Sequence, residues 1–277
     1  GLYIGPFVPP VVTIMGLTGL TYGQFLKSAG IPLAIIVWGS TFFMACRTQR
    51  KTEGHEEYSE ADKEAADFKP DEKCKRATLA FLAAMAVTIV YGLIAKAGAS
   101  YAILVMMTVS IIVGLVGGLA FKESLTTMIQ GGSKMFWMFF MFVLFDPFLN
   151  YVSASGAFDA ITKLMEPLIA TGGEVAFMMI ASAIGVFGIS GTGVAQAQII
   201  HELFLPMVNA MRMDMYTWAL IVLVGCQVTF FVTPTVDMVG QMGLARSKNI
   251  KAMLANGWVL TIITFAYVLV RAIIYVS

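Results

Sequence analysis

The sequence predicts an all-α integral membrane protein that is built from inverted repeats with re-entrant hairpins and broken helices. Three observations predict this fold. Of the 277 residues, 58% are hydrophobic and 13% are charged, whereas soluble domains average about 25% charged residues. Apolar windows of about 20 residues, long enough to cross a bilayer, recur along the chain. A segment interrupted by Pro and Gly near the start of the chain recurs near its end.

The composition excludes several classes of protein. The net charge is +1, and nine of the 17 acidic residues lie between Glu53 and Glu72, so the rest of the chain is almost uncharged. This distribution excludes a soluble enzyme, a nucleic-acid-binding protein and a disordered chain. The three cysteines are unclustered and favour neither a disulfide framework nor a zinc site. We therefore expect a lipid bilayer around the protein, no enzymatic activity, no cofactor and no nucleic-acid partner.

Residues 1–46 are expected to be the C-terminal end of a first repeat. Residues 1–20 are apolar but contain three Pro and repeated Gly, which favours a broken or re-entrant helix. Ala29–Cys46 is a full span. The connecting loop, residues 47–76, holds eight basic and nine acidic residues. Basic residues at both ends of this loop place it in the cytoplasm, as expected for a multi-pass protein of the cell (inner) membrane.

Residues 77–277 are expected to form a second, nearly complete repeat. Scaffold spans occupy about 77–152 and end in a Phe-rich helix that Asp146-Pro147 interrupts. A hairpin and a broken helix occupy about 155–255, and the last span is 256–276. The expected pieces are, in order, 77–95, 100–121, an amphipathic Lys122–Lys134, Met135–Val152, an interfacial Ser155–Ala170, Glu174–Gly188, Gln196–Met211, Tyr216–Val232 and Asn256–Val276.

Comparison of the chain with itself gives the strongest signal. When residues 1–20 are shifted by 224 positions, eight of 20 residues match, including one Pro and three Gly. The matching pairs are Gly1/Gly225, Phe7/Phe231, Val8/Val232, Pro10/Pro234, Val12/Val236, Gly16/Gly240, Gly19/Gly243 and Leu20/Leu244. After a three-residue insertion, Lys27-Ser28-Ala29-Gly30 aligns with Leu254-Ala255-Asn256-Gly257.

The two copies carry different charges before their final spans. Arg246, Lys248 and Lys251 precede the second span, whereas Lys27 alone precedes the first. This asymmetry is what inverted-topology repeats require, because basic residues favour the cytoplasmic side. Since residues 1–46 cover only the end of one repeat, we expect a missing first-repeat segment, supplied by the same chain or by a second chain.

The first candidate site is a Gly-rich run between two apolar stretches. Ser190, Gly191, Thr192 and Gly193 open the backbone where a plain helix would need none of them. Two hydroxyl groups and the freed backbone groups can bind a carboxylate or a small cation such as Na⁺, and a half-helix N-terminus favours an anion. A face of small residues that packs helices together is the alternative.

The second candidate site is the break formed by Thr233, Pro234, Thr235, Val236 and Asp237. Pro234 removes a backbone donor and exposes carbonyl groups one turn earlier, which favours Na⁺. Asp237 is a carboxylate in an apolar stretch and is a candidate cation ligand or proton carrier. The alternative is that Asp237 caps a half-helix.

Three further acidic or basic positions are weaker candidates. His201 and Glu202 follow the first break, where they could relay a proton, gate the site or lie at an interface. Asp146 lies late in the Phe-rich span, where a role at a helix end or in a subunit contact is at least as well supported as one in the site.

The sequence resembles the ion transporter superfamily of secondary carriers, and most closely its divalent anion/sodium symporter and citrate-transporter branch. Ser190-Gly191-Thr192 stands where that family has a Ser-Asn-Thr hairpin tip, and Thr233-Pro234-Thr235-Val236 where it has a Thr-Pro-Pro-Asn-like break. Val8-Pro9-Pro10-Val11, followed by Phe25–Leu33, is similar to the end of the family's first repeat. TRAP-type large subunits, with a Thr-Pro-Pro-Val sequence, are a further relative.

The resemblance implies a secondary active transporter that moves a small organic anion, coupled to Na⁺ or H⁺, by an elevator mechanism in a homodimer. Gly193 and the three residues before it would contact the anion. Pro9, Pro10 and Thr13 would form the half of the binding site that the first repeat contributes. Ser190, Thr192, Thr233, Pro234, Thr235 and Asp237 are the Na⁺ candidates. The alternatives are a sodium/proton antiporter that uses Asp237 and a membrane subunit of a two-chain transporter.

Overall fold

The computed structural model describes residues 3–52, 71–134, 136–188, 193–235, 238, 239, 242 and 249–276. All regular elements in these ranges are helices, which confirms the predicted all-α class. The elements are α1 (Pro9–Thr18), α2 (Tyr22–Phe25), the π-helical turn η1 (Leu26–Gly30), α3 (Ile31–Thr52), α5 (Glu72–Ile94), α6 (Ala99–Val116), α7 (Phe121–Lys134), α8 (Phe136–Ala154), α9 (Ala157–Ala183), the π-helical turn η3 (Ile184–Gly188), α10 (Gly193–Ala210), α11 (Met215–Val232) and α13 (Ile250–Val276).

Six of the described helical segments are long and apolar enough to cross a membrane. They are Tyr22–Lys51, Glu72–Ile94, Ala99–Val116, Thr171–Gly188, Met215–Val232 and Ile250–Val276. Their surfaces carry many exposed large apolar side chains, which water does not tolerate in patches of this size but lipid does. The chain is therefore a multi-pass membrane protein.

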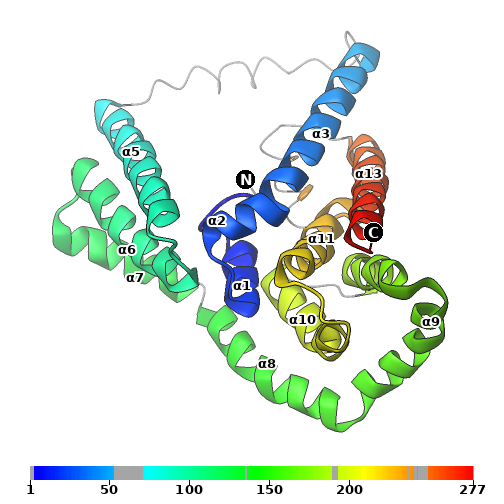
Figure 1. Ribbon diagram of the computed structural model, residues 1–277. Helices are drawn as coiled ribbons and strands as arrows, with labels where there is room; N and C mark the ends of the chain where they lie inside the picture. The colour runs from blue at the N-terminus through cyan, green and yellow to red at the C-terminus, as the bar shows by residue number, and fades with distance from the viewer. Residues whose placement is uncertain are drawn as a thin grey trace.

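The helices form a core unit and a side lobe (Figure 1). The core unit contains α1, α2, η1, α3, α9, η3, α10 and α13 around the central helix α11. Of the residues in the apolar window of α11, 78% are buried, against 6% for α5. The side lobe contains α5, α6 and α7, and α8 connects it to α9 as a curved arm (Figure 1).

The side lobe meets the core unit through small residues and one backbone hydrogen bond. The amide of Tyr22 donates to the carbonyl oxygen of Ala97 at 3.3 Å. A methyl group at Gly23 would lie 3.6 Å from Leu93, which is ordinary contact distance. A small, mostly apolar cavity lies at this junction between Phe7 and Tyr101.

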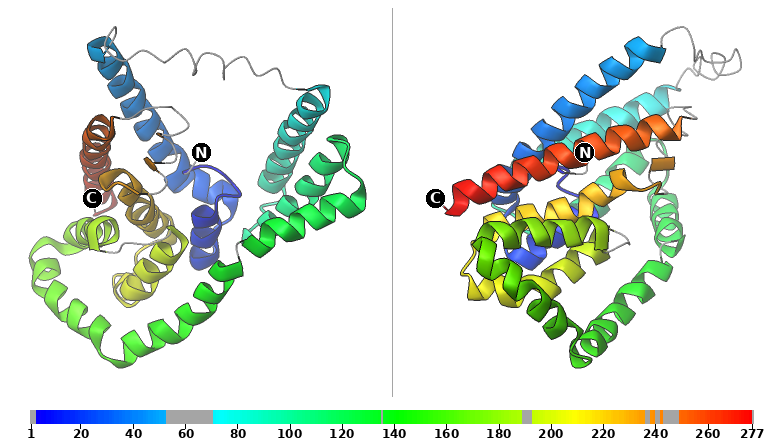
Figure 2. Two further views of the ribbon diagram at one scale, coloured as in Figure 1. Left: turned by 180° about the vertical axis from the view of Figure 1, so that it is seen from behind. Right: turned by 90° about the vertical axis from the view of Figure 1, so that its right-hand side faces the viewer.

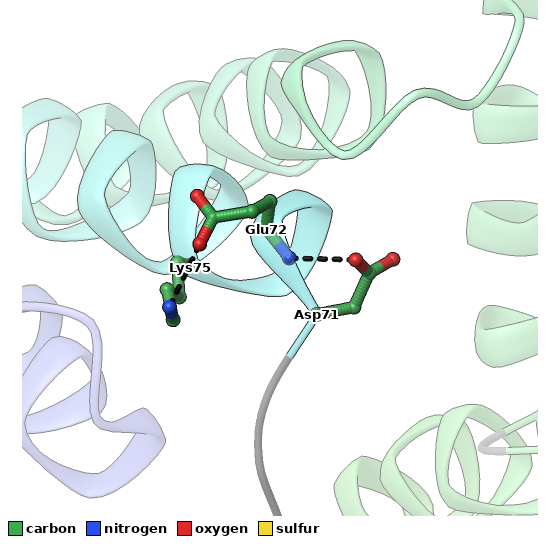
Figure 3. A network of polar contacts seen from close by, with 3 residues as sticks. All are labelled: Asp71, Glu72 and Lys75. Atoms are coloured by element: carbon green, nitrogen blue, oxygen red, sulfur yellow. Dashed lines mark hydrogen bonds and ion pairs between the residues drawn. The ribbon is translucent and has the colours of Figure 1, made fainter.

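Helix α5 begins immediately after the residues of the connecting loop that the structure does not describe. Asp71 adopts an extended conformation, and its carboxylate accepts a hydrogen bond from the amide of Glu72 at 2.7 Å (Figure 3). Lys75 and Glu72 form an ion pair at 2.7 Å, with both side chains exposed. An exposed pair of this kind contributes about 0–1 kcal/mol, so the acidic cap rather than the pair sets where α5 starts.

Helices α11 and α13 pack in opposite directions. The amide of Asp214, at the start of α11, donates to the hydroxyl of Tyr275 at 3.3 Å, near the end of α13. At the other end, a methyl group added to Gly257 would overlap the carbonyl oxygen of Phe231. Gly257 therefore lets α13 approach the backbone of α11. Helix α13 also contacts α3, and the two lie side by side (Figure 2).

Candidate functional site

The Pro-rich segment within residues 1–20, where a broken helix was expected, is the start of helix α1. Val8 has an extended conformation (φ −72°, ψ 123°), and its carbonyl oxygen accepts the amide of Val12 at 3.1 Å. Pro9 and Pro10 follow as the first helical residues. Prolines fit there because the first amides of a helix have no intrahelical partner. Thr13 lies one turn after Pro9 and is half-buried.

Helix α10 begins at Gly193, and this start meets α1 and α11. A methyl group at Gly193 would lie 2.9 Å from Cγ of Pro10, 3.4 Å from the ring of Phe230 and 3.5 Å from the carbonyl oxygen of Cys226. A side chain larger than hydrogen would separate these helices. The structure thus brings together Pro10 and Gly193, two predicted site residues that are far apart in the sequence.

The meeting point of α1 and α10 has the electrostatics of an anion site. Each helix carries a partial positive charge at its N-terminus, equivalent to roughly half an elementary charge. Neither helix has an acidic residue in its first turn, so its own side chains do not neutralise this charge. Two such ends in contact favour a bound carboxylate. Ser190, Gly191 and Thr192 lie outside the described residues.

The second predicted break follows helix α11. Thr233 is extended (φ −124°, ψ 154°). The hydroxyl oxygen of Thr235 accepts the amide of Met238 at 3.3 Å, and its carbonyl oxygen accepts the amide of Val239 at 3.0 Å. Thr235 therefore caps a new helical turn. Thr233 and Pro234 are exposed and Thr235 is half-buried. Val236 and Asp237 lie outside the described residues.

A buried glutamine that the sequence analysis did not select ties three core elements together. The side-chain amide of Gln196 donates to the carbonyl oxygen of Gly185 at 2.8 Å and to that of Gly225 at 3.3 Å. Gly185 belongs to η3, whose wider π-helical turn changes the usual carbonyl partners. A methyl group at Gly185 would lie 2.6 Å from Cα of Gly225, so the two backbones touch. Gln196 satisfies the carbonyl groups at this crossing.

His201 pairs with a tryptophan. The indole N–H of Trp218 donates to Nδ1 of His201 at 3.0 Å. Phe177 and Phe204 pack around Trp218, and His201 is buried whereas Glu202 is exposed. His201 thus lies in the packed core between α10 and α11, and its ring pairs with Trp218. The side chain of Asp146 lies outside the described ones.

The described residues contain no cluster of three His, Cys, Asp or Glu side chains that could hold a metal ion. Any cation in the described part of the site would therefore rely on hydroxyl and carbonyl oxygens. No family model, curated protein or solved structure matches this chain.

Proposed function

We propose that this protein is a secondary active transporter that moves a small organic anion across the membrane, coupled to Na⁺ or H⁺. The observation that carries the proposal is the contact between the N-termini of α1 and α10 at Pro10 and Gly193. The contact lies inside a membrane-spanning core, where an uncompensated helix end is expensive unless a ligand or a neighbouring group meets it. Carriers commonly bind the carboxylate of their substrate at broken-helix ends of this kind.

Matching glycines support the proposal of two inverted repeats. In the first copy, a methyl group at Gly30 would lie 3.0 Å from the carbonyl oxygen of Tyr3. In the second copy, Gly257 abuts the carbonyl oxygen of Phe231. Gly30 and Gly257 align in the two copies, and each meets the backbone of the segment that leads into its break. The contact between α3 and α13 also fits a pseudo-two-fold relation.

The remaining parts of the proposal concern the mechanism and the assembly. The core unit would move relative to the side lobe and the Phe-rich arm in an elevator mechanism, as in the ion transporter superfamily. The slender junction between the core unit and the side lobe supports this division. The protein would act in the inner membrane as a homodimer, with residues 47–76 in the cytoplasm.

Uptake into liposomes tests the proposed function. We expect liposomes containing the purified full-length protein to accumulate labelled succinate when a Na⁺ or a pH gradient is imposed, and protein-free liposomes not to do so. Succinate is used because it is a small dicarboxylate. Dissipation of a pH gradient by Na⁺ without any organic acid would instead indicate an antiporter. Absence of organic-acid uptake under either gradient, with succinate and citrate as probes, would contradict the proposal.

A further inference from the structure

Two buried polar side chains beside the candidate site have no hydrogen-bond partner among the residues that the structure describes. Gln227 on α11 is fully buried, and both its Oε1 and its Nε2 are unpaired. Tyr3 is 3% exposed, and its hydroxyl is unpaired as well. A buried amide without a partner costs about 1–3 kcal/mol by mutational data. Buried polar groups are normally paired, so each of these needs an explanation.

Gln227 and Tyr3 lie next to the meeting point of α1 and α10. Cys226, the neighbour of Gln227, has its carbonyl oxygen at Gly193. Tyr3 belongs to the same buried core as Cys226, and its carbonyl oxygen lies at Gly30 of η1, the turn that packs on α11. On the next face of α11, Phe231 abuts Gly257 of α13. The side chain of Gln227 therefore projects between the face that meets α10 and the face that meets α13. Tyr3 and Gln227 also occupy the same position in the two copies, because they align at the shift of 224 residues.

The chemistry of a carboxamide selects its ligand. The side chain of Gln227 has an acceptor and a donor next to each other. A cation would pair with Oε1 and leave Nε2 without an acceptor. A carboxylate ion would pair with Nε2 and place negative charge beside Oε1. A protonated carboxyl group has a donor and an acceptor at the same spacing, so it satisfies both atoms in a cyclic pair.

Among the residues that the structure describes, the elements next to Gln227 place no charged side chain beside it. Helix α1 and turn η3 carry no ionisable side chain, and Lys27 of η1 is exposed. In the described part of the chain, Tyr3 and Cys226 are the titratable groups beside Gln227. Tyr22 is more distant and donates to Ile4. On α10, His201 accepts from Trp218, which is nine residues away on α11, and Glu202 is exposed. Lys251, Tyr267, Arg271 and Tyr275 lie on α13, and Asp159, Lys163 and Glu174 lie on α9 before Phe177.

We propose that Gln227 and Tyr3 bind one carboxyl group of the substrate in its protonated form. A second carboxyl group, ionised, would lie at the helix ends beside Gly193. The coupling proton then travels on the substrate, and no carboxylate of the protein has to carry it. This inference rests on the proposed function and specifies its substrate as the monoprotonated form of a dicarboxylic acid.

A comparison of succinate with succinamate tests whether the site recognises the protonated carboxyl group, because the two compounds have similar shapes but titrate differently. Succinamate carries one carboxylate and one carboxamide, so it mimics monoprotonated succinate at every pH above the pKa of its own carboxyl group. In wild-type liposomes we expect the KM for total succinate to rise about tenfold per pH unit above the second pKa of succinic acid, because the monoprotonated fraction falls by that factor. The constant for inhibition of uptake by succinamate should not change with pH.

Two substitutions test the residues. Gln227→Leu removes both hydrogen-bonding atoms. It should raise the KM for succinate and the inhibition constant for succinamate by about tenfold or more. It should also flatten the pH dependence while leaving the melting temperature unchanged or higher, since an unpaired buried amide is lost. Tyr3→Phe removes only the hydroxyl and should show a smaller loss in the same direction. Ser182→Ala removes another buried, unpaired hydroxyl, on α9, and serves as the control that should leave uptake unchanged.

The outcomes distinguish this inference from the function it rests on. If wild-type protein takes up succinate with a KM that is independent of pH, or if Gln227→Leu keeps the wild-type pH profile, the protonated-carboxyl site is wrong and the transport proposal stands. If wild-type protein takes up no organic acid, both are wrong.

Discussion

Gly257→Ala is expected to lower the free energy of unfolding by about 3 kcal/mol or more, which is at the high end for a single substitution. The added methyl group would overlap the carbonyl oxygen of Phe231. Because that oxygen belongs to the backbone, α13 would have to shift away from α11 and lose contacts along its buried face. Thermal unfolding of the purified protein in detergent measures the effect as a lower melting temperature.

Gly39→Ala is the matched control for this prediction. Gly39 lies within α3, is exposed, and has open space where a Cβ atom would be. Alanine there should be neutral or stabilising by about 0.5–1 kcal/mol, because glycine is a poor helix former. Equal melting temperatures for Gly257→Ala and wild type would show that α13 does not pack on α11 as described.

Gly193→Ala is expected to reduce the initial rate of succinate uptake at least about tenfold. Its methyl group would lie 2.9 Å from Pro10, so the N-termini of α1 and α10 would have to move apart by several tenths of an ångström. Misplacement of about 1 Å in a binding constellation can cost about 100-fold. The rate is measured in liposomes with equal amounts of protein, and thermal unfolding checks that the variant is folded.

Gly188→Ala controls for the loss of a glycine in the same stretch. Among the described residues, a methyl group at Gly188 would meet only Ile184, one turn earlier, at 3.4 Å, so uptake should remain near the wild-type rate. If Gly193→Ala transports at the wild-type rate, the contact between α1 and α10 is not part of the binding site.

The features that the sequence predicted correctly are those with a local physical cause. Apolar windows predicted the membrane-spanning helices, and the amphipathic segment Lys122–Lys134 corresponds to α7 (Phe121–Lys134). The break before Pro9 follows from the fixed backbone of proline. The gap expected between residues 170 and 174 contains Gly173, whose backbone is non-helical (φ 60°, ψ −149°) inside α9.

The features that the sequence did not reveal depend on tertiary contacts. Gly185 and Gly225 come into contact only because η3 and α11 pack against each other. In the sequence, each of them is an ordinary small residue in an apolar stretch. Gln196 and Gln227 look alike as single polar residues in apolar helices. Gln196 bridges two carbonyl groups, whereas the side chain of Gln227 has no hydrogen-bond partner in the described part of the chain. The signal that the sequence offered for both glutamines was a single polar residue in an otherwise apolar segment.

The central claim is that a carboxylate binds where α1 meets α10, and protection of a cysteine at Thr13 tests it most directly. Thr13→Cys would be made in a protein with Cys46 and Cys74 replaced by serine, while the buried Cys226 remains. Its alkylation by a water-soluble maleimide would be timed with and without succinate. We predict that succinate slows the alkylation at the concentrations that saturate uptake. An alkylation rate that succinate leaves unchanged, in protein that takes up succinate, would contradict the account.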